Sequence, residues 1–324
     1  MLLEVRDLRV EFRTRDGVAK AVNGVDYHVD KGETLAVLGE SGSGKSVTAQ
    51  AIMGILDTPP SRITGGEILF QGRDLLKLKE DERRTVRGAE MAMIFQDALS
   101  SLNPVLTVGD QLGEMFTVHR GMSRKDARTK AVELMDRVRI PAAAQRVRDY
   151  PHQFSGGMRQ RIMIAMALAL EPALIIADEP TTALDVTVQA QVMDLLAELQ
   201  RELGMGLILI THDLGVVADV ADRIAVMYAG RIVESAPVHD LYKAPAHPYT
   251  RGLLESIPRL DQKGRELYAI AGLPPNVMHI PPGCAFHPRC PMARDMCRTD
   301  EPPLYEVSDV RGSACHFWRE CLDG

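Results

Sequence analysis

One short segment of the sequence has the residue types and spacing needed to hold phosphate. GESGSGKS, residues 39–46, fits the pattern G-x-x-x-x-G-K-[ST]. Its glycines let backbone N–H groups point inward at phosphate oxygens, and a following helix adds its positive end. Lys45 would reach the β and γ phosphates of a nucleotide, and the Ser46 hydroxyl would bind Mg²⁺. The alternative, a chance match in a flexible loop, is disfavoured by the apolar run before the segment and the helical pattern after it. The residues predicted to bind nucleotide here are Gly39, Ser41, Gly42, Ser43, Gly44, Lys45, Ser46 and Val47.

Four further polar residues could complete a phosphate-cleaving site. Asp178 and Glu179 end the apolar run ALIIADE; Asp178 would join the Mg²⁺ shell, and Glu179 would act as general base on a water. Paired acids of this kind are sometimes only a solvated strand end, but here they accompany a phosphate loop. Gln96, a candidate Mg²⁺ ligand and catalytic residue, follows MAMIF, and His212 follows LILIT. A lone Gln is usually a surface residue and a lone His is usually a core residue. The functional assignment of Gln96 and His212 therefore requires that both lie beside the same pocket.

The sequence also contains the elements that would gather these residues. Four short runs, TLAVLGE, MAMIFQ, ALIIADE and LILITHD, are almost wholly apolar and end in polar residues. Strands this apolar are buried on both faces, which predicts a parallel sheet covered by helices. Ligands of such sheets bind at the carboxyl ends of the strands, so one site is expected to collect all four polar ends.

The rest of the chain predicts helices, two hairpins and a change of character near its last quarter. Helices are predicted at 45–56, at 186–203 and within 105–150, with a break at Pro141. The hairpins GEILFQGRDL and IAVMYAGRIVES would turn at Gln71-Gly72 and Ala229-Gly230. The proline-rich AGLPPNVMHIPPGC predicts irregular structure. We therefore expect two domains, residues 1–255 and 256–324.

The bulk composition excludes several classes of function. The net charge of −6 argues against a broad nucleic-acid surface. The longest apolar run, IMIAMALAL, stops well short of the ~18 residues that a membrane-spanning helix needs. MLLEVRDLRVEF has no apolar core of a secretory signal, so a cytoplasmic protein is expected.

A second glycine-rich segment, FSGGMRQR at 154–161, completes a set of motifs that resembles the ATP-binding cassette (ABC) family. The order and separations of the motifs match the family throughout residues 1 to about 240. The matching motifs are GESGSGKS as Walker A, FQD as Q-loop, FSGGM as signature, LIIADE as Walker B, ALD at 183–185 as D-loop and THD as switch histidine. The resemblance implies an α/β fold: a P-loop NTPase cassette with a RecA-like parallel sheet, an antiparallel β part, a helical subdomain at about 97–160 and a small, irregular, Cys-rich C-terminal extension.

The family mechanism implies why one chain would carry two phosphate-binding segments. Two cassettes dimerise head to tail, and Ser155, Gly156 and Gly157 of one would bind the γ-phosphate held by the other. Asp185 would bridge the dimer seam, and His212 would contact the γ-phosphate. The family also implies that Phe12 stacks on adenine; its alternative is a core residue of a strand. Met158 stands where the family usually has Gln, although the serine and glycines carry the phosphate contact.

The segment APAHPYTRGLLESIPRL and the cysteine-rich region after it resemble the C-terminal extension of oligopeptide and dipeptide importer ATPases. This implies a subunit at the cytoplasmic face of the membrane that couples ATP hydrolysis to peptide uptake. Its partners would be a second ATPase, similar but distinct, two membrane permeases and an external substrate-binding protein, with a permease docking near Asp97–Leu112. Nickel and some sugar importers share this tail. The acidic charge argues against a soluble ABC ATPase of repair or translation. Intact Glu179 and His212 argue against a catalytically silent cassette.

All five cysteines lie after residue 283, and in a reducing compartment this clustering favours metal over disulfides. Four of them lie within about thirty residues: Cys284, Cys290, Cys297 and Cys315. Four thiolates suit zinc or an iron–sulfur cluster, and the spacings are looser than in most zinc sites. Some members of the resembling family carry a [4Fe–4S] cluster at cysteines placed like these, so we predict that cluster, with zinc or free thiols as alternatives. Cys321 is expected to be a spare.

Overall fold

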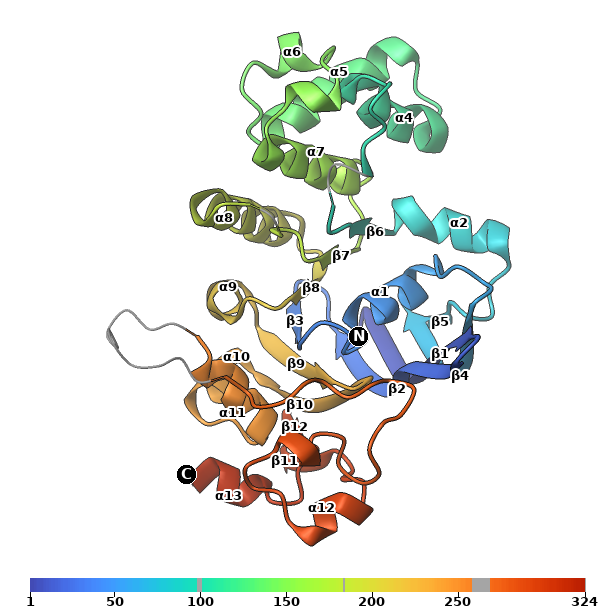
Figure 1. The fold of residues 1–324 in the computed structure, drawn as a ribbon. Coiled ribbons are helices and arrows are strands. Elements are labelled where there is room, and N and C mark those ends of the chain that lie inside the picture. Colours follow the sequence, from blue (N-terminus) through green and yellow to red (C-terminus); the bar gives the residue numbers. More distant parts are fainter. Residues whose placement is uncertain (98–100, 183, 258–268, 324) are drawn as a thin grey trace.

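The structure is a computed structural model that describes residues 1–97, 101–182, 184–257 and 269–323. Two β-sheets form its lower part, and a group of helices stands above them (Figure 1). The larger sheet has eight strands, in the order β11 (Tyr305–Ser308), β12 (Arg311–Ser313), β10 (Arg231–Pro237), β9 (Arg223–Tyr228), β3 (Thr34–Leu38), β8 (Gly206–Thr211), β7 (Leu174–Asp178) and β6 (Met91–Ile94).

The middle of this sheet is the parallel core expected from the sequence. Strands β9, β3, β8, β7 and β6 run parallel, and all four predicted apolar strands are confirmed. Alternate residues enter two separate cores: Ile175 and Ala177 of β7 lie in one, and Leu174 and Ile176 in the other. Because both faces are buried, the strands carry no alternating polar pattern.

A smaller antiparallel sheet lies beside the core. Its order is β2 (Gly17–Val29), β1 (Leu3–Thr14), β4 (Ser61–Phe70) and β5 (Arg73–Asp74). The β4–β5 hairpin turns at Gln71-Gly72 and the β9–β10 hairpin at Ala229-Gly230, as predicted. Helix α1 (Lys45–Met53) packs between the two sheets through Ala49 and Ile52. The helix ends earlier than predicted because Gly54 adopts a left-handed conformation, with φ 64°.

The helices form two groups. Helices α4 to α7 make the upper part of Figure 1, and the others lie around the sheets. The break predicted at Pro141 separates α5 from α6. The helices after α1 are α2 (Glu80–Ala89), α4 (Val108–Arg120), α5 (Arg124–Arg137), α6 (Ala143–Arg146), α7 (Gly156–Leu168), α8 (Val186–Leu203), α9 (Leu214–Val220), α10 (Val238–Lys243), α11 (Pro248–Glu255), α12 (Asp295–Thr299) and α13 (Trp318–Asp323).

The C-terminal part of the chain, which we call the tail (residues 269–323), is joined to the core sheet. Strand β12 pairs with β10, where Glu234 lies opposite Ser313. Glu234 is fully buried and forms an ion pair with Arg311, at 3.2 Å. Ser313 Oγ donates a hydrogen bond to the carbonyl of Ala246. The segment 271–284 is irregular, as predicted, but the tail as a whole contributes strands to the sheet.

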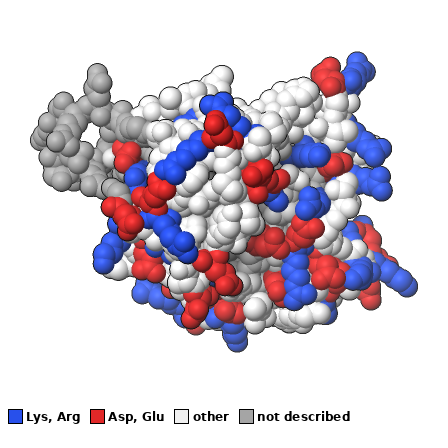
Figure 2. Space-filling view, turned by 90° about the horizontal axis from the view of Figure 1, so that it is seen from below, with Lys and Arg blue, Asp and Glu red and all other residues white. Residues whose placement is uncertain are grey.

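Two surface properties bear on the possible partners. Within the described ranges, no helix combines the length and the apolar character needed to cross a bilayer. Figure 2 shows the lower face of the molecule, where Lys and Arg are interspersed with Asp and Glu. This face therefore presents no continuous field of one sign.

Candidate functional site

Residues 39–46 form the turn after β3 and the first residues of α1, as predicted. Two glycines of this loop are required by close backbone packing. A Cβ on Gly39 would lie 2.2 Å from the carbonyl oxygen of Met227, and one on Gly44 would lie 2.3 Å from that of Ala21. Gly44 also has φ 104°, a conformation that L side chains rarely adopt, at the N-cap of α1. The loop therefore keeps its shape only with glycine at these two positions.

Lys45 is buried at the centre of this loop. Its Nζ donates hydrogen bonds to the carbonyls of Gly39, at 2.7 Å, and Glu40, at 3.0 Å. Burial lowers the pKa of Lys45, while the negative charges of Glu179 and Asp178 oppose that shift. The ammonium group thus lies where the loop glycines and two carboxylates converge.

Ser46 and Asp178 are brought together across the sheet. Ser46 Oγ donates to Asp178 Oδ1 at 2.9 Å, and Asp178 is buried at the end of β7. Burial raises the pKa of Asp178, and the hydrogen bond from Ser46 lowers it in part. A hydroxyl and a carboxylate in contact are a donor set that suits Mg²⁺.

Glu179 is the centre of the second half of the site. Its Oε2 accepts hydrogen bonds from Gln96 Nε2 and Thr182 Oγ1, both at 2.9 Å. Its Oε1 lies 3.4 Å from His212 Nδ1. The residue has φ 47°, and its N–H donates to the carbonyl of Ile210 on β8. The polar ends of β6, β7 and β8 therefore meet at one carboxylate, as the sequence predicted.

Two details of this cluster differ from the sequence-based picture. Gln96 contacts Glu179 rather than the Asp178–Ser46 pair. Thr182 was not predicted, because a hydroxyl three residues after Glu179 carries no pattern of its own. Its position in the turn after β7 places its hydroxyl against the Glu179 carboxylate.

The signature residues lie at the start of α7, in the upper, helical part of Figure 1, whereas α1 lies between the sheets below. Ser155 caps α7 by accepting a hydrogen bond from the N–H of Met158, at 3.4 Å. Gly157 packs against α8, where an added Cβ would lie 2.4 Å from Val188 Cγ1. Asp185 caps α8 through the N–H of Val188. Ala183 of the D-loop lies outside the described residues.

Phe12 and Val47 have structural contacts of their own. Both are partly buried and pack against the core beneath the small sheet. Phe12 lies on β1 opposite Ala19 and Ser61. Their predicted nucleotide contacts stay predictions.

The four predicted metal ligands, Cys284, Cys290, Cys297 and Cys315, line one small pocket of the tail together with His287 and His316. In the part of the chain that the structure describes, no three His, Cys, Asp or Glu side chains are placed to hold a metal ion. The described residues therefore show no formed site for the predicted [4Fe–4S] cluster or for zinc. Burial raises the pKa of Cys284 to about 11 and that of Cys290 to about 12. Cys321 is buried, and its Sγ donates to Met292 Sδ at 3.6 Å. Its interaction with Cys315 helps to raise the pKa of Cys315.

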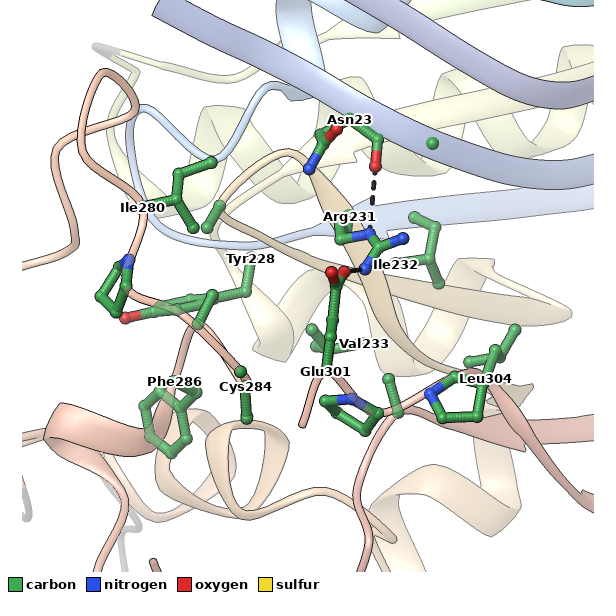
Figure 3. Close-up of a pocket in the computed structure, with 18 of the residues that line it drawn as sticks. Asn23, Tyr228, Arg231, Ile232, Val233, Ile280, Cys284, Phe286, Glu301 and Leu304 are labelled. Carbon is green, nitrogen blue, oxygen red and sulfur yellow. Dashed lines mark hydrogen bonds and ion pairs between the residues drawn. The ribbon is translucent and has the colours of Figure 1, made fainter. Parts of the chain in front are cut away.

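A separate pocket of about 330 Å³ lies between the core sheet and the tail (Figure 3). Tyr228 and Phe286 lie on one side of it, and the ion pair between Arg231 and Glu301 crosses the other. None of the predicted nucleotide-binding residues lines this pocket. It marks the junction of cassette and tail rather than the nucleotide site.

Comparisons with known proteins point to one family for this chain. A family model described as ABC transporter matches residues 22–182, and one described as the oligopeptide/dipeptide transporter C-terminal region matches residues 233–297. The chain is 54% identical to the oligopeptide transport ATP-binding protein OppD of Bacillus subtilis, covering 95% of this chain and 87% of that protein. It is 53% identical to OppD of Salmonella typhimurium, covering 97% and 93% of the two chains.

A solved structure shares the cassette fold. The dimeric ATP-binding cassette MJ0796, in a post-hydrolysis state bound to ADP and Pi, aligns with a TM-score of 0.66 and 28% identity. The alignment covers 73% of this chain and 98% of that one. The P-loop NTPase cassette fold predicted from the motifs is therefore confirmed. Together these findings show that the chain is an ATPase that belongs to the ABC transporter family, in the group with the oligopeptide/dipeptide transporter C-terminal region.

Proposed function

We propose that this chain is the ATP-hydrolysing subunit of an importer that takes up di- or oligopeptides. The observation that carries the proposal is the position of Glu179 between Gln96 and His212, beside the Ser46–Asp178 pair. The peptide cargo is supported by the names of the relatives, which are transport ATP-binding proteins for oligopeptides and dipeptides. The tail shared with such transporters supports it further.

The residues of the site have distinct roles in this proposal. Mg²⁺ would be held by Ser46 and Asp178, with Gln96 nearby, and would neutralise charge on the phosphates. Lys45 and the N–H groups of the loop bind the phosphates. Glu179 accepts a proton from water as the water oxygen attacks the γ-phosphorus and the bond to the β-phosphate oxygen breaks. His212 stabilises the charge that develops on the γ-phosphate.

The site is completed by a second cassette. Ser155, Gly156 and Gly157 lie at the start of α7 in the helical part, where they would bind the nucleotide of a partner rather than that of their own chain. Asp185 would lie at the seam between the two cassettes. The dimer of the solved relative that holds ADP and Pi supports this arrangement.

The membrane partners would bind near the helical part. Val105 and Leu106 expose 75% and 40% of their surface within the predicted docking segment Asp97–Leu112, of which residues 98–100 lie outside the description. Exposed apolar side chains suit a protein interface better than a nucleic acid. We propose two permeases, an external binding protein, a similar second ATPase and a peripheral position at the cytoplasmic face, with residues 1–255 as the nucleotide-binding domain.

A [4Fe–4S] cluster at Cys284, Cys290, Cys297 and Cys315 remains a proposal, supported only by the pocket that these thiols share. No step of ATP hydrolysis depends on it. Anaerobic iron, sulfide and zinc analysis of the full chain tests it, and absence of all three elements leaves the free thiols.

The function is tested in the transporter reconstituted with its permeases. Glu179→Gln should lower ATP turnover and labelled-peptide uptake by about 100-fold or more while ATP binding persists, because the general base is lost. Glu133→Gln, an exposed change on α5, is the matched control. Unchanged turnover in Glu179→Gln would show that this site is not the working one. Uptake of nickel or sugar, but not peptide, would refute the cargo.

A further inference from the structure

The phosphate loop is held by an arginine that lies far outside the cassette motifs. Arg289 of the tail forms a two-bond ion pair with Glu40, the second residue of the loop. Nη1 lies 2.6 Å from Glu40 Oε2, and Nη2 lies 3.0 Å from Oε1. The Arg289 side chain is only 5% exposed and that of Glu40 is 28% exposed. A buried, bidentate pair of this kind is stronger and more directional than a surface salt bridge.

Arg289 is itself fixed on every side. Its Nε donates to the carbonyl of Ala271 at 3.0 Å, and Nη1 lies 3.4 Å from the hydroxyl of Tyr228. The guanidinium carbon lies about 6 Å from the ring centres of Tyr228 and Phe286, both visible in Figure 3. A planar guanidinium with this many partners has one orientation, which it imposes on Glu40.

Glu40 also carries backbone contacts that reach the phosphate-binding lysine. Its N–H donates to the hydroxyl of Tyr249 at 2.9 Å, and its carbonyl accepts from Lys45. Tyr249 packs against Tyr228 and Phe286, with ring centres 4.6 and 5.3 Å away. One loop residue therefore connects Lys45 to an aromatic cluster and to the tail.

We propose that Arg289 is a positioning residue of the ATP site, and that the tail is thereby part of that site. A carboxylate in a loop that binds a triphosphate repels the ligand, and Arg289 acts on the site by neutralising this carboxylate. The inference rests on the proposed assignment of residues 39–46 as the ATP site. It gives the tail a role in nucleotide affinity that no cassette motif encodes.

The experiment measures ATP affinity of the full chain by titration with a fluorescent ATP analogue and with ATP in competition. Arg289→Met should weaken ATP binding by about fivefold or more, since the charge of Glu40 is left unpaired. The double variant Arg289→Met with Glu40→Gln should return to within about twofold of wild type, because the repulsion is gone. The matched control is Arg298→Met, an exposed tail arginine.

Recovery of ATP affinity in the double variant separates neutralisation of Glu40 from a merely structural role of Arg289. Equal ATP affinity in Arg289→Met and Arg298→Met overturns the inference. So does a double variant as weak as Arg289→Met, because then loss of tail packing, not the charge, explains the defect. Lys45→Ala separates the assignment of the ATP site from the role of Arg289. If Lys45→Ala keeps full ATP affinity, residues 39–46 are not the ATP site. If Lys45→Ala loses affinity but Arg289→Met does not, only the role of Arg289 is refuted.

Discussion

His247 is buried without a charge, so acid should destabilise the fold through this residue. The residue is 1% exposed, and its Nδ1 accepts a hydrogen bond from the N–H of Tyr249 at the start of α11. Burial lowers the pKa of His247 from 6.5 to about 3. The imidazole is therefore neutral in the folded protein at every pH at which the chain would be handled.

The size of the effect follows from the two pKa values. Because the folded pKa is depressed, His247 takes nothing from the free energy of unfolding above pH 6.5. It lowers that free energy progressively as the pH falls from 6.5 towards 3. At pH 5 the imidazole of His247 is protonated in the unfolded chain but neutral in the folded chain. Each pKa unit is worth about 1.4 kcal/mol, so His247 should lower the free energy of unfolding by about 2 kcal/mol between pH 7 and pH 5.

Urea denaturation of the full chain at pH 7 and pH 5 measures this change. His247→Asn keeps an acceptor for the Tyr249 N–H but does not titrate, so it should lose about 2 kcal/mol less than wild type over the same interval. His239→Asn, an exposed change on α10, should behave as wild type. Equal losses in wild type and His247→Asn would refute the reasoning.

Three further outcomes are expected. Ser155→Arg should abolish hydrolysis at the partner's nucleotide while ATP binding to the isolated chain is unchanged; loss of that binding would contradict the trans arrangement. Gly44→Ala should lower the free energy of unfolding by about 1–3 kcal/mol, because its Cβ would meet the carbonyl of Ala21 at a strained φ, and thermal denaturation checks this. Arg311→Met should destabilise the chain by about 3 kcal/mol, because the buried Glu234 carboxylate loses its ion-pair partner. A melting temperature equal to wild type would exclude that role for Arg311.

The sequence was most informative where apolar runs are strong and end in polar residues. The strands before Gln96, Glu179 and His212 could be predicted because they are buried on both faces, and parallel strands bring such ends together. The contact between Ser46 and Asp178 could be predicted because both residues belong to motifs expected to bind the same ion.

The parts that could not be predicted depend on contacts between distant residues. Strand β12 has three residues, Arg311–Ser313, and so has no periodicity to detect. The pairing of β1 with β2 is interrupted by register shifts that blur its alternation. The partnership of Glu40 and Arg289 joins residues with no shared motif. Cysteine spacing alone did not fix where the thiols would lie.

The addition of β12 to β10 bears on how the protein is made. Until residues 311–313 leave the ribosome, the outer edge of β10 has no neighbour from the tail, and unpaired strand edges invite association with other chains. Strand β12, which covers this edge, is therefore synthesised after the other strands of the sheet. The finished molecule ends this sheet instead with β11, a four-residue strand whose side chains are alternately exposed, and so short an edge is a poor template for aggregation.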